Sequence, residues 1–96
     1  MTRLTLISSR KQPLKPLVEA ALNNELRLLD AGVKRTEKKL KLFETQFGMT
    51  TTAFLKRYEN NELQETLEFA EWVGEYRMLF RLIEKTQTLR EVQFAD

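Results

Sequence analysis

The sequence predicts an all-α fold: a long antiparallel helical hairpin with coiled-coil-like packing and a short connecting helix. Composition supports this, because 31% of the 96 residues are charged, 42% are hydrophobic, and only three glycines and two prolines interrupt the chain. The first half carries an unbroken heptad pattern, and the second half carries a broad apolar face at helical spacing. We expect residues 1–96 to form a single helical domain.

The first helical arm is predicted over residues 13–47 by a seam of positions spaced alternately four and three residues apart. Thr36 is the polar position of this seam, and we interpret it as tolerated packing. Gly32 lies inside the arm and costs about 1 kcal/mol relative to alanine, so a break into two helices near Gly32 is the main alternative. The unbroken phase of the pattern favours one helix. The apolar members of the seam are Leu22, Leu26, Leu29, Val33, Leu40, Phe43 and Phe47.

A short connecting helix is predicted over residues 51–58. Gly48 is suited to end the first arm, because glycine accepts the left-handed conformation that often follows a helix. Thr50 or Thr51 can cap the short helix, which carries Phe54 and Tyr58.

The second arm is predicted over residues 66–91, with Thr66 as its cap. Gly74 lies inside this arm, where a glycine usually indicates close approach of another helix. The apolar face of the arm contains Phe69, Trp72, Val73, Tyr76, Leu79, Phe80 and Ile83.

The charge distribution favours an antiparallel pairing of the two arms. Residues 1–57 contain twelve Lys and Arg against five Asp and Glu, a net charge of +7, whereas residues 58–96 contain four against nine, a net charge of −5. A hairpin brings the basic run of the first arm against the acidic start of the second. Each exposed ion pair adds only a few tenths of a kcal/mol, so charge selects the orientation more than it stabilises the fold.

The two ends of the chain alternate with the period of a strand, at Leu4 and Leu6 and at Val92 and Phe94. Short terminal strands are therefore expected, forming a ribbon within one chain or across a dimer. A domain of this size leaves much of its surface uncovered, and we expect a homodimer that forms a helical bundle.

The residue inventory argues against an enzyme and against a cofactor or metal. The chain has no cysteine and no histidine, which removes thiolate chemistry, the commonest zinc ligand and the commonest general base. No Gly-rich phosphate loop or nucleophile elbow is present. Glu68, Glu71 and Glu75 share one helical face, which we interpret as solvated rather than metal-binding. The absence of cysteine and of a long apolar segment leads us to expect a cytoplasmic protein that does not enter the membrane.

Two groups of residues are candidates for binding a partner. Trp72, Tyr76 and Phe80 form an aromatic stripe, although packing in the core is the simpler interpretation of such a stripe. Clustered basic residues can also bind nucleic acid, but no aromatic side chain is interleaved here to stack on bases, so a solvated or cross-paired helix face is preferred. The basic candidates are Lys34, Arg35 and Lys38.

Three motifs lie between Leu40 and Leu89: Phe47-Gly-Met-Thr, then Phe54-Leu-Lys-Arg-Tyr58, then Glu68-Phe-Ala-Glu-Trp-Val-Gly-Glu-Tyr76. This stretch resembles a family of small helical proteins of bacteria and archaea that are encoded beside small toxin-like genes and are regarded as antitoxins. The resemblance implies a protein-binding module that binds and blocks a small protein toxin. A self-associating structural coiled coil and a nucleic-acid-binding helical protein are the alternatives.

Overall fold

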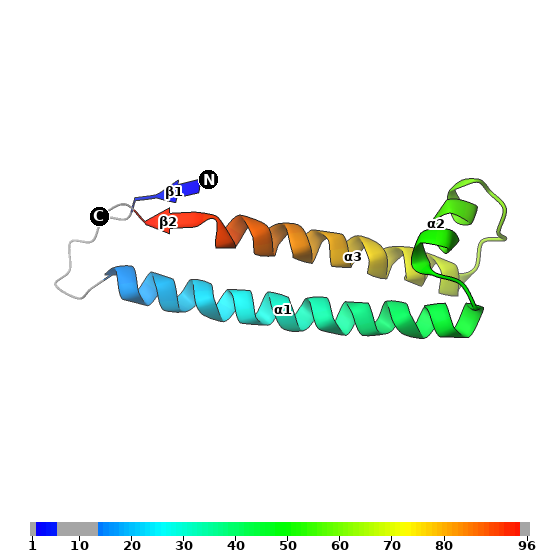
Figure 1. Cartoon of the computed structure of the whole chain (residues 1–96), viewed down its shortest axis with the longest axis horizontal. Helices are drawn as coiled ribbons and strands as arrows, with labels where there is room; N and C mark the ends of the chain where they lie inside the picture. The colour runs from blue at the N-terminus through cyan, green and yellow to red at the C-terminus, as the bar shows by residue number, and fades with distance from the viewer. Residues whose placement is uncertain (1, 6–13, 95–96) are drawn as a thin grey trace.

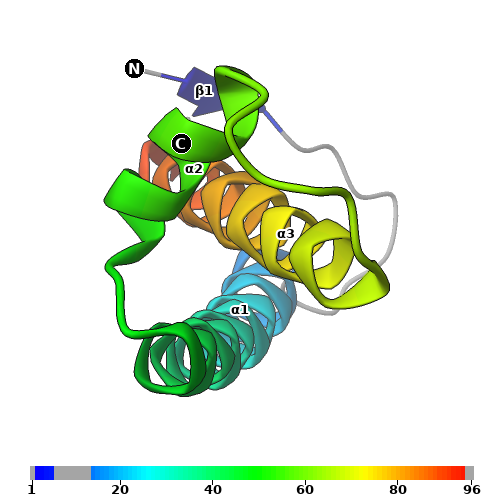
Figure 2. The same ribbon diagram turned by 90° about the vertical axis from the view of Figure 1, so that its right-hand side faces the viewer.

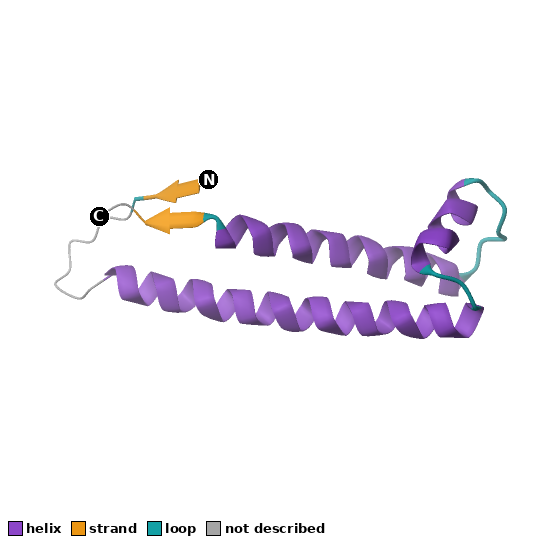
Figure 3. Cartoon of the chain, in the orientation of Figure 1, coloured by secondary structure: helices purple, strands orange, loops and turns teal. Residues whose placement is uncertain are grey.

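The chain forms an elongated helical hairpin, described by a computed structural model for residues 2–5 and 14–94 (Figures 1 and 3). The molecule measures 61 × 21 × 18 Å along its principal axes. Helix α1 spans Leu14–Phe47 and helix α3 spans Leu67–Arg90. The two helices pack antiparallel along their length. The predicted all-α hairpin with a short connecting helix is thus confirmed. The predicted first residue of α1, at position 13, lies outside the described residues.

Helix α1 continues through Gly32 without a break, so the alternative of two helices is wrong. A methyl group added at Gly32 would lie 3.3 Å from Leu82 Cδ1, which is closer than most such contacts. Gly32 therefore faces Leu82 of α3, and the missing side chain leaves room for that leucine. Gly74, predicted to mark such a place, has no atom within 4 Å of the same added group.

The helix α2, Thr51–Glu59, lies across the hairpin at the turn end (Figure 2). Gly48 ends α1 with a φ of 65°, a left-handed conformation that glycine adopts without strain. Thr50 Oγ1 accepts a hydrogen bond from the Ala53 amide at 3.1 Å and caps α2. Thr66 caps α3 in the same way, through the Phe69 amide at 3.0 Å.

One ion pair joins the two arms among the described residues: Lys39 Nζ lies 3.2 Å from Glu75 Oε1. Gln46 Nε2 donates a further hydrogen bond to Glu68 Oε2 at 2.8 Å. The pairing therefore follows the predicted charge complementarity, but most of the basic run stays exposed and faces solvent.

At the end opposite the turn, β1 (Thr2–Leu4) lies beside β2 (Val92–Phe94). The two strands are parallel, with Thr2 opposite Val92 and Leu4 opposite Phe94. This pairing is within one chain. Leu6, also expected in the first strand, lies outside the described residues.

Candidate functional site

An aromatic cluster fills the turn end of the hairpin, where α1, α2 and α3 meet. The Phe54 ring of α2 stacks on Trp72 of α3, with ring centroids 3.9 Å apart and planes 1° from parallel. Phe43 and Phe47 of α1 stack on the same indole at 5.5 Å and 5.7 Å. Both Phe54 and Trp72 are 0% exposed. The cluster is therefore the main core of the molecule and fixes α2 on the hairpin.

A chain of hydrogen bonds completes the docking of α2. The Trp72 indole N–H donates to Thr51 Oγ1 at 3.0 Å, and the Thr51 amide donates to Glu44 Oε2 at 2.7 Å. The first residue of α2 is thus bonded to both arms. No buried side-chain nitrogen or oxygen in the described part of the chain lacks a partner. Because a buried N–H group costs free energy when it is unpaired, Thr51 stabilises this core alongside its apolar members.

Trp72 is not a partner-binding residue, which corrects the sequence-based prediction. Its indole is fully covered by rings from α1 and α2, so a partner could not reach it. The simpler interpretation, packing in the core, holds for this residue. The sequence could not show it, because the periodicity of α3 does not reveal which part of its apolar face α2 covers.

The predicted seam of α1 faces α3 and belongs to the hairpin itself. Leu29 and Leu40 are buried, and Thr36 is buried with them. The other seam residues are half-buried: Leu22, Leu26, Val33, Phe43 and Phe47. Since this face is occupied within one chain, it is a scaffold rather than an open dimer surface.

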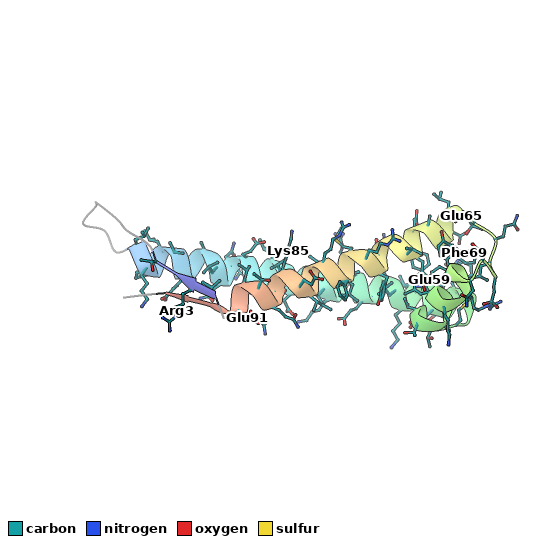
Figure 4. The ribbon with its side chains drawn as sticks, turned by 90° about the horizontal axis from the view of Figure 1, so that it is seen from above. Arg3, Glu59, Glu65, Phe69, Lys85 and Glu91 are labelled. Atoms are coloured by element: carbon teal, nitrogen blue, oxygen red, sulfur yellow. The ribbon has the colours of Figure 1, made fainter. Side chains whose placement is uncertain are left out.

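Tyr76 and Phe80, the other two aromatic candidates, are exposed together with Ile83, and Phe80 is 57% exposed. We call these three residues the α3 stripe. They continue a single line of positions, spaced four and three apart, that begins with Phe69 and Val73 under α2. A hollow of about 530 Å³ on this surface is lined by Tyr76, Arg77, Phe80, Arg81 and Glu84. Figure 4 places Phe69 at the turn end beside α2 and Lys85 well away from it along α3.

The three basic candidates are exposed on α1, but they are not equivalent. Lys34 Nζ lies 3.2 Å from Asp30 Oδ2 within the helix. Arg35 and Lys38 project from the same part of α1 with exposed side chains. These basic residues do not line the hollow that contains Tyr76 and Phe80.

The sequence did not predict that three leucines of α1 would be exposed: Leu17, Leu28 and Leu42. Ile83 was recognised as part of an apolar face but not as exposed. A second count at heptad spacing along α1 would have found the leucines.

No group of three or more acidic side chains within residues 2–5 and 14–94 is placed to hold a metal ion. Tyr58 is the group with a clearly shifted pKa in this part of the chain: its hydroxyl donates to Glu65 at 2.6 Å, and this hydrogen bond raises the pKa, with smaller contributions from desolvation and the Glu65 charge. None of the helices described is long and apolar enough to span a membrane.

Comparison with protein-family models, with curated proteins and with solved structures finds no match. The geometry and the resemblance given above therefore carry the functional proposal.

Proposed function

We propose that this chain is a protein-binding module, the antitoxin of a toxin–antitoxin pair, and that it binds a small protein toxin through the α3 stripe. The observation that carries the proposal is the open continuation of a helix-binding face. Phe69 packs against the Phe54 ring of α2, Val73 is buried in the same cluster, and Tyr76, Phe80 and Ile83 extend the same line of positions beyond them.

The α2 helix indicates what kind of ligand this face accepts. It packs across α3 through the Phe54 ring, which lies 5.3 Å from Phe69 and 3.9 Å from Trp72 between centroids. The exposed side chains of the α3 stripe lie at positions i, i+4 and i+7. An amphipathic partner helix that binds in a groove presents its own apolar side chains at the same spacing. Exposed aromatic residues of this kind commonly dominate binding energies.

The charges beside the α3 stripe define the partner further. Arg77 and Arg81 line the hollow with Tyr76 and Phe80, and Glu84 lines it as well. An apolar helix face bordered by acidic residues would complement this surface, because each arginine can pair with a carboxylate. The antitoxin assignment itself rests on the resemblance of residues 40–89 to antitoxin-like helical proteins.

The proposal predicts that a small toxin protein is encoded beside this chain, and that protein is the partner used in the test. Its expression should stop cell growth, and co-expression of this chain should restore growth. Phe80→Glu should weaken binding of the purified pair by at least about a hundredfold in titration calorimetry, because it places a charge in a desolvated aromatic contact. Met78→Glu is the matched control, since Met78 is exposed on α3 outside the stripe.

Three results would contradict the proposal. The first is a neighbouring protein that neither inhibits growth nor binds. The second is equal loss of binding in both variants, which would move the contact off the α3 stripe. The third is a complex of this chain and its partner that falls apart when the preparation is treated with nuclease. That result would favour nucleic-acid binding through Lys34, Arg35 and Lys38.

A further inference from the structure

Helix α1 carries a second heptad pattern on its outward side. Positions 17, 21, 24, 28, 31, 35, 38 and 42 are spaced alternately four and three residues apart, and every one of them is exposed. Each lies five residues before a position of the seam, or about 140° around a helix with 3.6 residues per turn. We call these positions the outer stripe. Its members are Leu17, Ala21, Asn24, Leu28, Ala31, Arg35, Lys38 and Leu42.

The outer stripe contains all the large exposed hydrophobic residues of α1 in the described range. These are Leu17, Leu28 and Leu42, and Leu28 is 58% exposed. The stripe spans 26 residues, almost four heptads, which is long enough for a stable coiled coil. Three leucines and two alanines occupy five of its eight positions, and an exposed row of apolar side chains over this length has the form of an interface.

We propose that a second copy of this chain docks antiparallel along the outer stripe, with the two-fold axis between positions 29 and 30. The stripe is symmetric about that point: Leu17 opposes Leu42 of the second copy, and Leu28 opposes Ala31 of the second copy. Because both contacts occur twice, the surface is complementary to itself, as a two-fold interface requires.

The polar members of the outer stripe fit the same alignment. Asn24 opposes Arg35 of the second copy, and Ala21 opposes Lys38 of the second copy. The small Ala21 side chain leaves room for the lysine stem. Asn24 Oδ1 already accepts a hydrogen bond from Arg27 of its own helix, and its second lone pair can accept one from the guanidinium. Polar residues within an otherwise apolar heptad pattern commonly fix register and orientation.

Charge selects the antiparallel orientation over the parallel one. Residues 34–41 contain five basic residues and one acidic residue, and residues 18–25 contain two acidic residues and no basic one. These two segments oppose each other in the antiparallel alignment, which brings Arg35 near Glu25 of the second copy. A parallel alignment would set the basic segments side by side. Lys34 does approach Arg27 of the second copy, and its 3.2 Å ion pair with Asp30 offsets that repulsion.

The proposed interface leaves the α3 stripe free. The seam of α1 stays on α3, and the outer stripe adds a contact on the far side of α1, so two hairpins join through their first helices. This assembly goes beyond toxin binding, since the outer stripe shares no residue with the α3 stripe.

Sedimentation equilibrium of the full chain tests the assembly. The chain should be a dimer, and Leu28→Glu or Ala31→Glu should weaken dimerisation by at least about a hundredfold. The contact between Leu28 and Ala31 of the second copy occurs twice in each dimer, and either substitution removes both copies. Helix content measured by circular dichroism should be retained, since both side chains are exposed in a single hairpin. Leu67→Glu is the matched control, an exposed leucine outside the outer stripe. A chain that is monomeric, or a dimer that survives both substitutions, overturns the proposal.

Cysteine cross-linking tests the orientation, and the absence of native cysteine makes it unambiguous. A mixture of Leu17→Cys and Leu42→Cys chains should cross-link with a short bismaleimide, while either variant alone should not. Self-cross-linking of the Leu17→Cys chain would indicate a parallel dimer and overturn the alignment.

Charge exchange provides a second test of the alignment. Arg35→Glu with Lys38→Glu should weaken dimerisation, and adding Glu19→Lys with Glu25→Lys to the same chain should restore it. Failure of the fourfold variant to recover dimerisation would show that segments 18–25 and 34–41 do not oppose each other.

Discussion

Replacement of Phe54 by alanine should separate α2 from the hairpin. Phe54 is 0% exposed and stacks on Trp72 at 3.9 Å, so the substitution removes the ring that joins α2 to the core. A buried Phe→Ala change costs about 3–5 kcal/mol, and a domain of this length has about 5–14 kcal/mol in total. The nine-residue α2 is shorter than the ~12–15 residues that an isolated helix needs, so it should unfold once released.

Trp72 is the single tryptophan of the chain, so fluorescence emission reports on the contact between α2 and the core alone. Release of α2 exposes Trp72, so its fluorescence emission should shift to the red in native buffer, while circular dichroism should still report the helices α1 and α3. Urea unfolding followed by both signals should give the loss of about 3–5 kcal/mol.

Phe80→Ala is the matched control for that experiment. It deletes the same atoms from a side chain that is 57% exposed, and it should change the free energy of unfolding by no more than about 0.5 kcal/mol. A cost below about 1 kcal/mol for Phe54→Ala would refute the assignment of Phe54 to the core, since measured costs for buried rings are several times larger. Equal costs for the two variants would refute the distinction between the covered and the open parts of α3.

Three further substitutions test other features of the fold. Thr51→Val keeps the shape of the side chain but removes the acceptor of the Trp72 indole N–H, so it should cost about 1–3 kcal/mol in urea unfolding. Gly74→Ala should stabilise the chain by about 0.5–1 kcal/mol and raise the melting temperature, because an added methyl meets no atom within 4 Å and alanine favours the helix. Tyr58 has a pKa raised by its hydrogen bond to Glu65, so its contribution to stability should be complete below its ordinary pKa of about 10 and should be lost as the pH rises through the higher folded value. Tyr58→Phe should abolish that alkaline loss in melting temperatures recorded from pH 8 upward, and a variant that keeps the same alkaline loss would assign it to another group.

The helices could be predicted from the sequence because helical periodicity is a local property. The seam fixed α1 as one helix through Gly32, and the caps Thr50 and Thr66 gave the starts of the other two helices. The roles of the glycines could not be predicted in the same way. Whether a glycine inside a helix faces a neighbour depends on the rotation of that helix in the hairpin, and this brings Leu82 to Gly32 while Gly74 faces open space.

The candidate site was predicted less completely for a similar reason. The aromatic positions of α3 form one line in the sequence, but α2 covers Trp72 and leaves Tyr76 and Phe80 open. The division between them depends on the length and crossing of a nine-residue helix, and these are properties of the folded molecule rather than of the α3 pattern.

The position of the aromatic cluster at one end of a 61 Å molecule implies a gradient in local opening along the hairpin. Amide hydrogens near Leu40 and Val73 should exchange with solvent slowest, at rates close to those of global unfolding, because opening there breaks the core. Amides near Leu89, at the far end of α3, should exchange through fraying that leaves the turn end folded. Tyr76 and Phe80 lie beside the protected end, so a helix bound to the α3 stripe would extend protection outward along α3, and exchange rates could locate the bound partner without a structure of the complex.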